Sequence, residues 1–541
     1  MLSLFLSAIA SVFFIIYSLR TGGPGFPLDD AWIHQTYARN LARYGEWVYV
    51  PGHPSAGSTS PLWTLLLTFP YAVGIDWRAW TFSLGIAFSG AAAWAIQKLT
   101  VGFGWGKREA FLTSCFLSLE WHMVWAAVSG MEIPLFSFLS LFSMALCLEG
   151  WPFQGRSTLR TTGMGILLGL LCLVRPEGLI LGALLFLAFL SRNPLKALAF
   201  AGGMALCLVA YGAFNFHLSG NFFPNTFYAK AAEYRELVEK FPLWVRIRQV
   251  AAPALVGAQV MLIPGMLWGA LKGVSLENRT FRLIPILWVI LHLLAYALRL
   301  PVGYQHGRYV MPVIPVLVAL GVPGTLELLK KVPPLMAKVW GLSTGVLLLA
   351  FLLLGARAYA TDVGIIQCEM VKVAYWLAEN TPPGSLIAVH DIGAIGYFSG
   401  RELLDLAGLV NPEVIPFIRD ESQLKRFILS RGADYFVTFP SWYPTLTKDP
   451  TFVPIYSTGC SLTVEAGSDN ITVYAVKKEP LQKPLGAFGH NLYYGYKFYD
   501  LVPYPAPLPE GLGSRGCPGW LCFYFNDCKL CSHSISGRDC L

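Results

Sequence analysis

Long apolar stretches recur along the first 357 residues and are separated by short polar segments. A helix of about twenty apolar residues can cross a bilayer. Eleven stretches approach that length: 3–19, 80–97, 109–127, 132–148, 160–174, 177–190, 197–217, 250–271, 282–299, 309–323 and 336–355. The pattern predicts an all-α, polytopic membrane domain over residues 1–357 with about eleven transmembrane helices.

Two of the apolar stretches allow a second interpretation. The stretch 61–75 is short and contains Pro61 and Pro70, so it either crosses the membrane or lies along its surface. The first stretch resembles a signal peptide in length, but it lacks a basic start and an A-x-A cleavage site. We therefore expect stretch 3–19 to be an anchor and 61–75 not to cross.

The charges between the apolar stretches fall into two sets. Five short loops are basic, and the positive-inside rule places them in the cytoplasm. These loops contain Lys98, Lys107 and Arg108; Arg156 and Arg160; Arg192 and Lys196; Lys272, Arg279 and Arg282; and Lys330, Lys331 and Lys338. The other set consists of the loops on the opposite side of the membrane, at residues 21–79, 129–133, 175–178, 218–249 and 300–308. This predicts a multi-pass protein of the plasma (inner) membrane with a cytoplasmic N-terminus and an extracytoplasmic C-terminal part.

The sequence changes character after residue 357. A helical pattern at 365–380 ends in the stop signal Asn380-Thr-Pro-Pro-Gly384. Strand-like segments at 386–389, 402–405 and 434–438 alternate with a helical segment near 421–430. We predict an extracytoplasmic α/β domain over 358–480, followed by a Cys-rich tail at 481–541.

Composition supports the membrane class and excludes others. Only 13% of the residues are charged and 55% are hydrophobic, and the mean hydropathy is +0.52. Soluble domains carry about twice that share of charge. Soluble enzymes and disordered scaffolds are therefore excluded. The net charge of +8 is not gathered into a basic run or arm, so nucleic acid is not an expected partner.

The cysteines divide between the membrane stretches and the rest of the chain. Cys115, Cys147, Cys172 and Cys207 lie in apolar stretches, where packing explains them. Seven others lie outside: Cys368, Cys460, Cys517, Cys522, Cys528, Cys531 and Cys540. The five from Cys517 to Cys540 crowd together, which predicts a disulfide-stapled tail in an oxidising compartment. The alternative is a zinc site formed by Cys528, Cys531 and His533 with a further cysteine.

The first outer loop contains an acidic pair, Asp29 and Asp30. Residues 33, 37, 41 and 44 form one apolar stripe of an amphipathic helix, which we expect to lie along the outer membrane surface. His34 lies one turn beyond Asp30 on the same face. In one interpretation Asp29 is an N-cap and Asp30 complements the helix dipole. In the other, the pair is catalytic.

Further charged residues lie at the ends of outer loops. Glu132 and Glu177 begin apolar stretches, and charges near membrane depth are usually functional or paired. Arg175 could simply pair with Glu177. A cation could also be a snorkelling side chain, but four on one side predict a phosphate site. These four are Arg175, Lys230, His306 and Arg308.

An acid pair and a cation cluster on one face suit sugar transfer from a lipid phosphate. One carboxylate, with Asp29 preferred, serves as general base towards an acceptor hydroxyl, and the cations stabilise the leaving phosphate. There is no Asp-x-Asp motif and no P-loop, and the spacing in Gly393–Gly400 is not that of a dinucleotide loop. We therefore expect no metal and no cofactor beyond the lipid-linked donor.

Several motifs together resemble GT-C glycosyltransferases, and within them the bacterial branch of terminal arabinofuranosyltransferases. The resemblance covers about residues 1–480. It rests on Asp29-Asp-Ala-Trp-Ile33, Gly57-Ser-Thr-Ser-Pro-Leu-Trp63, Ser129-Gly-Met-Glu132, Arg175-Pro-Glu-Gly178, Asn225-Thr-Phe-Tyr-Ala-Lys230, Gly307-Arg-Tyr309 and Asp391–Gly400 with Asp405–Leu409.

The resemblance implies an inverting transfer from a polyprenyl-phosphate sugar, with Asp29 or Asp30 as the base. It also implies that His34, Glu132, Glu177, Asn225, Tyr228 and Asp391 line the sugar or acceptor pocket. The sugar is open among mannose, aminoarabinose and arabinofuranose. The tail from about 481 departs from the family pattern, which leaves the acceptor open among a glycan, a lipid and a protein.

Two other function classes are weighed against this hypothesis. A lipid or glycan transporter predicts charges at mid-span and paired inverted halves, whereas the charges here gather at the ends of stretches. A binding protein held by a membrane anchor does not need eleven stretches. The sequence therefore favours an enzyme of the cell envelope.

Overall fold

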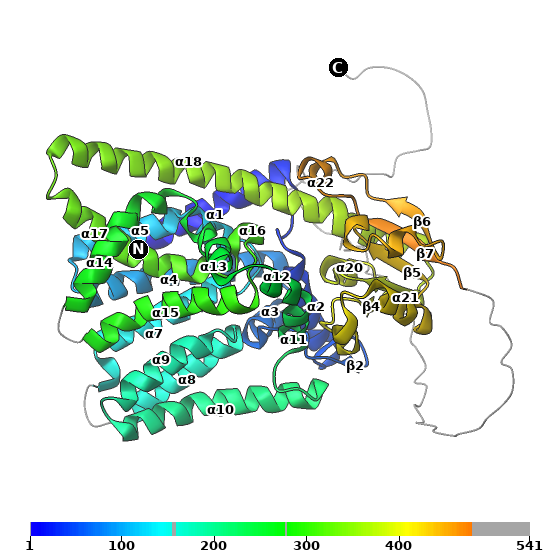
Figure 1. Ribbon diagram of the computed structural model, residues 1–541, viewed down its shortest axis with the longest axis horizontal. Coiled ribbons are helices and arrows are strands. Elements are labelled where there is room, and N and C mark those ends of the chain that lie inside the picture. Colours follow the sequence, from blue (N-terminus) through cyan, green and yellow to red (C-terminus); the bar gives the residue numbers. More distant parts are fainter. Residues whose placement is uncertain (1, 154–157, 276–278, 479–541) are drawn as a thin grey trace, which may run out of the picture. The chain divides into compact units, whose positions relative to one another are not determined.

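The computed structural model describes residues 2–153, 158–275 and 279–478 (Figure 1). The described residues form one compact unit. The predicted Cys-rich tail, with its alternatives of disulfides or zinc, lies outside the described residues.

Helices dominate the chain up to residue 380, and the longest ones run side by side (Figure 1). Their bounds are α1 Leu2–Thr21, α2 Asp29–Tyr44, α3 Pro61–Val73, α4 Trp77–Gly102, α5 Lys107–Leu119, α6 Trp121–Ala127, α7 Ile133–Leu148, α8 Thr158–Val174, α9 Gly178–Leu190, α10 Pro194–Ser219, α11 Asn225–Glu233, α12 Arg235–Lys240, α13 Leu243–Ala251, α14 Ile263–Ser275, α15 Arg279–Arg299, α16 Tyr304–Gly307, α17 Ile314–Leu329, α18 Pro334–Ile366 and α19 Lys372–Asn380. Short β1 (Val48–Val50) and β2 (His53–Pro54) form a small hairpin.

Helices occupy most of the predicted stretches, and together they form a polytopic membrane domain. Stretch 250–271 is the exception: it is not one helix, because α13 ends at Ala251, α14 begins at Ile263, and the chain bends by 100° between them. Within the described residues, six helices are long and apolar enough to cross a membrane, or seven if the bent pair 243–255 and 258–272 counts as one span. Helices α7, α8 and α9 are apolar but shorter. The number of crossings therefore stays a prediction. Stretch 61–75 forms the short helix α3, with Pro70 inside it.

Helix α2 confirms the helix predicted at the acidic pair, but it is not exposed along a surface. Nine of its sixteen residues are buried. Within the expected stripe, Tyr37 is fully buried whereas Tyr44 is 48% exposed. The covering groups come from distant parts of the chain: Trp32, for example, packs against Tyr397 and Phe398. Local periodicity did not contain that information.

The C-terminal part contains a five-stranded sheet with the order β4-β3-β5-β7-β6. Its elements are β3 Leu386–Val389, α20 Gly393–Phe398, β4 Glu402–Asp405, α21 Glu421–Ser430, β5 Tyr435–Thr438, β6 Phe452–Ser457, α22 Ser461–Glu465 and β7 Thr472–Val476. Strand β3 pairs in parallel with β4 and β5, and β7 pairs antiparallel with β5 and β6. The predicted α/β character is confirmed. The domain boundary at 358 stays a prediction, because the chain from α18 to α19 is one continuous helical segment.

A disulfide joins Cys368, between α18 and α19, to Cys460 beside α22. The sequence left the pairing of these two cysteines open. Cys115, Cys147, Cys172 and Cys207 are free, as their positions in apolar helices predicted.

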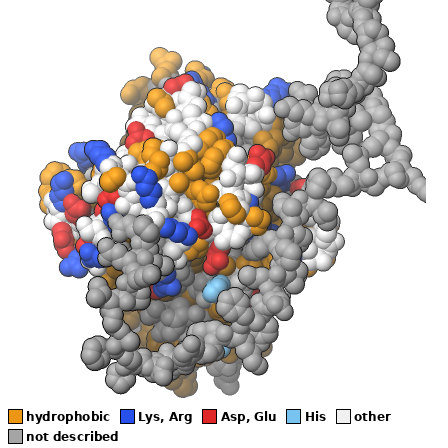
Figure 2. Space-filling view, turned by 90° about the vertical axis from the view of Figure 1, so that its right-hand side faces the viewer, with side chains coloured by type: hydrophobic (Ala, Val, Ile, Leu, Met, Phe, Trp, Pro, Cys, Tyr) orange, Lys and Arg blue, Asp and Glu red, His pale blue; other side chains and the backbone are white. Residues whose placement is uncertain are grey.

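The two parts of this unit have different surfaces. Helix α10 exposes Leu198 (66%), Leu206 (66%) and Val209 (69%), as expected of a helix that faces lipid. On the side of the sheet, charged groups of both signs alternate with small hydrophobic groups (Figure 2). Such a mixture is typical of a surface in water.

Candidate functional site

A cavity of about 410 Å³ lies where the ends of several helices meet. Its walls are largely apolar and include Leu179, Ile180, Phe223 and Phe227. Charged groups also line it: Asp30, Glu132, Arg175, Glu177, Lys230, Arg299 and Arg308. Six of these seven are residues that the sequence analysis selected. They come from α2, the start of α7, the α8–α9 turn, α11, the end of α15 and the segment after α16.

Asp30 is the acidic residue of the predicted catalytic pair that lines this cavity. Its carboxylate accepts a hydrogen bond of 2.7 Å from Arg308 Nη1, and Arg308 is only 4% exposed. Arg308 also donates to the Tyr309 hydroxyl at 2.9 Å. Burial opposes ionisation of Asp30, but the positive charges of Arg308 and Lys230 outweigh it and lower the pKa of Asp30 to about 2. Asp30 is therefore a charged carboxylate at neutral pH.

Asp29 has a different environment although it is the adjacent residue. Its two carboxylate oxygens accept the backbone N–H groups of Gly393 and Ala394, each at 2.7 Å. Asp29 therefore caps helix α20 and does not cap its own helix, which begins after Leu28 without a side-chain cap. Gly393 must be glycine here, because a Cβ atom would collide with the Asp29 carbonyl oxygen. Burial raises the pKa of Asp29 to about 6 against the effect of these two donors.

Arg175 lies between two carboxylates. Its guanidinium is 3.3 Å from Glu132 and 3.4 Å from Glu177. It also donates to the Tyr296 hydroxyl at 3.0 Å, and that hydroxyl donates in turn to Glu177. The pairing of Arg175 with Glu177, which was the simpler interpretation of the sequence, is therefore present together with a second partner.

His34 extends this network beneath the cavity. Its Nε2 lies 3.6 Å from the Glu132 carboxylate, and its Nδ1 lies 3.1 Å from the Thr64 hydroxyl. The side chain is buried, which lowers the pKa of His34. His34 does not line the cavity, but it helps to hold Glu132, which does.

Lys230 connects the cavity to the sheet part of the chain. Its ammonium group pairs with Glu233 at 3.1 Å. Glu233 is also 3.4 Å from Arg419 and 3.7 Å from His390. Burial opposes the positive charge of Lys230, but Glu233 raises the pKa of this lysine. Burial lowers the pKa of His390 to about 4, so this histidine is neutral at pH 7.

Arg299 was not selected from the sequence, where it reads as the basic end of an apolar stretch. It lines the cavity, and its guanidinium lies over the Phe227 ring at 4.0 Å. Among the residues that the structure describes, no carboxylate pairs with it. The cavity thus has four cationic and three acidic side chains. The sequence did contain a signal for Arg299: it is a cation on the predicted outer side, where the positive-inside rule makes cations uncommon.

His306 does not join the other predicted phosphate ligands. It pairs with Asp362 at 2.8 Å and packs against Trp121 and Trp125. The cause is the backbone: Gln305, His306 and Gly307 have φ values of 52°, 58° and 70°. These three left-handed residues turn the chain so that His306 lines a second cavity while Arg308 lines the first.

The other three predicted pocket residues lie around the cavity without lining it. Asn225 is buried, and its amide donates to the Leu409 carbonyl at 3.2 Å. Tyr228 is half-buried against Phe227. Asp391 is half-buried beside α20, where burial and the negative charge of Asp29 raise its pKa. Asn225 thus joins α11 to the sheet part.

No cluster of three or more His, Cys, Asp or Glu side chains that could hold a metal ion occurs within residues 2–153, 158–275 and 279–478. The groups in the cavity that could neutralise an anionic ligand are side-chain cations.

Comparisons with known proteins identify the fold. A family model described as a domain of unknown function (DUF8728) matches residues 357–476. No curated protein matches the sequence. The structure is similar to ArnT from Cupriavidus metallidurans bound to undecaprenyl phosphate, with 14% identity, a TM-score of 0.53, and coverage of 87% of this chain and 97% of that chain.

Two further solved structures are similar. One is the oligosaccharyltransferase AglB from Archaeoglobus fulgidus in complex with an inhibitory peptide and a dolichol-phosphate. It has 12% identity and a TM-score of 0.50, with coverage of 90% of this chain and 75% of that chain. The mycobacterial arabinofuranosyltransferase AftD has 15% identity and a TM-score of 0.45, which is too low to support an argument. At these identities the similarity establishes the fold: the chain has the GT-C fold, with a small sheet domain after the membrane helices.

Proposed function

We propose that this protein is an inverting glycosyltransferase that moves a sugar from a polyprenyl phosphate to a hydroxyl of a cell-envelope acceptor. The observation that carries the proposal is the composition of the charged cavity: apolar walls together with four cationic and three acidic side chains. Apolar walls suit an isoprenoid chain, and the cations suit its phosphate. The fold is shared with a protein whose structure contains undecaprenyl phosphate.

We assign the donor phosphate to Lys230, Arg299 and Arg308. Arg299 has no carboxylate partner among the described residues, so it can bind an anion without breaking an ion pair. Lys230 and Arg308 are each held by one carboxylate. Arg175, between Glu132 and Glu177, is already neutralised, and we assign it to shaping the sugar end of the cavity.

Asp30 is our choice for the general base, because it lines the cavity and Asp29 does not. In the reaction, the acceptor oxygen bonds to the anomeric carbon while the bond from that carbon to the phosphate oxygen breaks. The hydroxyl proton passes to Asp30, and polyprenyl phosphate leaves with the bonding electrons. The bound phosphate adds a negative charge near Arg308, which raises the proton affinity of Asp30 when the donor is present.

Asp29 has a positioning role in this scheme. Each of its oxygens accepts an N–H group of α20, so the carboxylate is held against that helix. By holding α20, Asp29 fixes the sheet part beside the start of α2 and so places Asp30. The sugar stays open among mannose, aminoarabinose and arabinofuranose, and we propose the extracytoplasmic side as the place of reaction.

The test is transfer by the purified full chain. We would supply a panel of radiolabelled polyprenyl-phosphate mannose, aminoarabinose and arabinofuranose together with membrane extract as acceptor. Transfer from one member, equal with and without EDTA, is the expected result. Turnover of nucleotide sugars alone would contradict the donor. Binding of polyprenyl phosphate without transfer from any donor would favour the alternative, a lipid or glycan transporter.

A further inference from the structure

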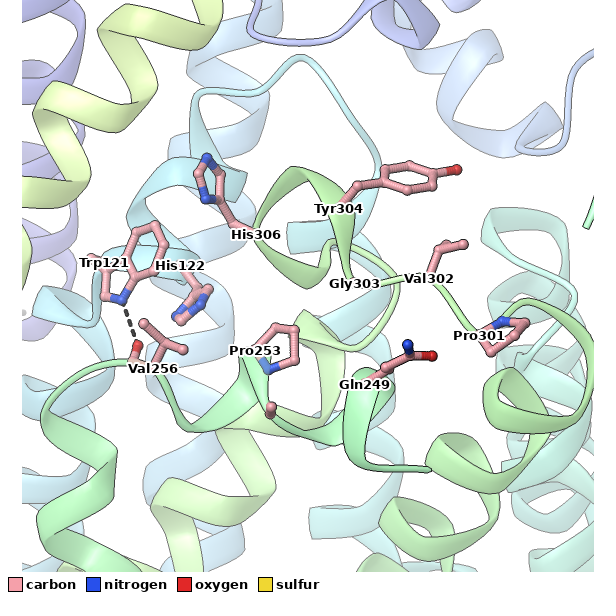
Figure 3. A pocket seen from close by; sticks show the side chains of 11 residues that line it. Trp121, His122, Gln249, Pro253, Val256, Pro301, Val302, Gly303, Tyr304 and His306 are labelled. Carbon is pink, nitrogen blue, oxygen red and sulfur yellow. Dashed lines mark hydrogen bonds between the residues drawn. The ribbon is translucent and has the colours of Figure 1, made fainter. Parts of the chain in front are cut away.

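A second cavity, of about 570 Å³, lies on the other side of the segment 304–309 (Figure 3). Tyr304 and His306 form one side of it, and Gln249 and Pro253 face them. Trp121 and His122 close a third side. The Trp121 ring is fixed by its Nε1–H, which donates to the Val256 carbonyl at 2.8 Å.

The lining of this cavity contains no lysine, arginine, aspartate or glutamate among the described residues. An anionic ligand would therefore lose its water shell without gaining a cation in return. A phosphate, a carboxylate or a nucleotide does not suit this lining. The ligand that fits carries no net charge.

The remaining groups suit a sugar better than a hydrocarbon chain. Two aromatic rings, Trp121 and Tyr304, offer apolar faces of the kind that stack on the C–H face of a sugar ring. The Gln249 amide makes no hydrogen bond to any residue within the described ranges. It can donate to and accept from hydroxyls. An isoprenoid chain would leave these polar atoms without partners.

His122 adds a buried polar group at this wall. Its Nδ1 lies 2.7 Å from the Glu120 carboxylate, which also accepts from Gln259 at 2.9 Å. A carboxylate only accepts, so a proton of His122 lies on Nδ1. His122 is 1% exposed, and its Nε2 has no partner in the described part of the chain. A ligand hydroxyl would satisfy this atom.

One short segment connects this cavity to the charged one. Tyr304 and His306 line the uncharged cavity, whereas Arg308 and Tyr309 line the charged cavity. The left-handed turn at 305–307 allows side chains of this one segment to line two different cavities. A ligand in the uncharged cavity is therefore separated by one turn of chain from Arg308, the partner of Asp30.

We propose that the uncharged cavity binds a neutral sugar unit of the acceptor, which places the acceptor opposite the polyprenyl-phosphate donor. The acceptor is then a glycan or a glycosylated molecule rather than a bare lipid or peptide. As a statement about the acceptor, this inference rests on the proposed function; as a statement about a sugar-binding cavity, it can be tested separately.

The binding test uses methyl glycosides of mannose, glucose, galactose and arabinofuranose that carry a photoreactive diazirine, with a diazirine-bearing isoprenoid alcohol as the competing probe. The wild-type full chain should be labelled by a glycoside in peptides that contain 249–256 or 301–306. Val302→Trp fills the cavity from its half-buried rim, and we expect labelling to fall at least about fivefold. Val209→Trp, on the exposed face of α10, is the matched control and should leave labelling unchanged.

If Val302→Trp does not fold, Gln249→Trp places the same side chain from the exposed helix α13. Equal labelling of wild type and a folded blocking variant would overturn the inference, and so would labelling of the cavity by the isoprenoid alone. A kinetic arm separates it from the proposed function: Val302→Trp should raise the acceptor KM about tenfold and leave the donor KM within about twofold. Transfer with an unchanged acceptor KM would contradict the acceptor site in the uncharged cavity but support the glycosyltransferase function. Glycoside labelling without transfer from any donor would support the sugar site but contradict the glycosyltransferase function.

Discussion

The two cavities on either side of residues 304–309 differ chiefly in charge. The smaller one is lined by four cationic and three acidic side chains. The larger one is lined by no lysine, arginine, aspartate or glutamate among the described residues. Both are bounded by aromatic rings from the same short segment. In a chain with only 13% charged residues, this concentration on one side of a turn is informative. It supports the proposal that the two cavities bind ligands of different chemistry.

The comparison also shows how the charged cavity is kept stable without a ligand. Buried charges are costly unless they are paired, and most charges here have a partner: Arg308 with Asp30, Arg175 with Glu132 and Glu177, and Lys230 with Glu233. Only Arg299 has no carboxylate partner within the described residues, and it is exposed. Each pair predicts what a substitution would do.

The largest effect is expected for Asp30→Asn. The change removes the proposed base and keeps the size of the side chain, so kcat/KM for transfer should fall by about 100- to 10,000-fold. It also leaves the buried Arg308 unpaired, and the double variant Asp30→Asn/Arg308→Gln shows whether lost stability contributes. Thermal unfolding in detergent is the second measurement.

The same substitution at an exposed aspartate, Asp469→Asn, is the matched control and should have wild-type activity. Full activity of Asp30→Asn, together with loss of activity in Asp29→Asn, would contradict Asp30 as the base and assign that role to Asp29.

The next effect concerns stability at Asp29. Asp29→Ala removes two hydrogen bonds from a carboxylate to the backbone of α20, and we expect the free energy of unfolding to fall by about 2–4 kcal/mol. Asp420→Ala removes an exposed cap of α21 and should lower the free energy of unfolding much less. Thermal unfolding of both variants under the same conditions measures the difference. Equal shifts would contradict the role of Asp29 in holding the sheet part.

The sequence predicted much of the charged cavity because its residues obey simple rules. Glu132, Arg175, Glu177 and Arg308 lie at ends of apolar stretches on one predicted side, where helix ends meet. Asp30 and Lys230 lie in loops on the same predicted side. Most predicted apolar stretches are also helices, since periodicity and length are local properties, whereas the bend of 100° within 250–271 was not predicted.

What the sequence did not predict depends on contacts between distant segments. His306 was grouped with Arg308 because they are two residues apart, and only the left-handed backbone at 305–307 separates them. The burial of α2 depends on α20, more than 350 residues later in the chain. Asp29 was weighed as a cap of its own helix, whereas the helix that it caps is α20. Such partners are not visible in a local pattern.

Arg299→Gln should have a moderate and selective effect. It removes a cation that we assign to the donor phosphate, so the donor KM should rise about tenfold, which corresponds to about 1.4 kcal/mol. The acceptor KM should stay within about twofold. This is the reverse of the pattern expected for Val302→Trp in the uncharged cavity, and the pair of variants tests the comparison directly. Arg235→Gln changes a 78% exposed arginine on α12 and is the control. A rise in the acceptor KM of Arg299→Gln would contradict the assignment of the cavities.

The smallest expected change is in the pH profile of kcat/KM. A base with a pKa of about 2 is ionised throughout the neutral range, so Asp30 predicts a change of less than about twofold between pH 8 and pH 5. A base with the pKa of Asp29, about 6, would instead lose about tenfold at pH 5. Unfolding does not produce that loss: the pKa of folded Asp29 lies above its ordinary value of 3.8, so protonating it between pH 6 and pH 4 favours the folded state. Arg308→Gln removes the main charge that lowers the pKa of Asp30, and it should move the acidic limb upward into the measurable range. A flat profile in wild type and an acidic limb in Arg308→Gln together would assign the base to the charged cavity.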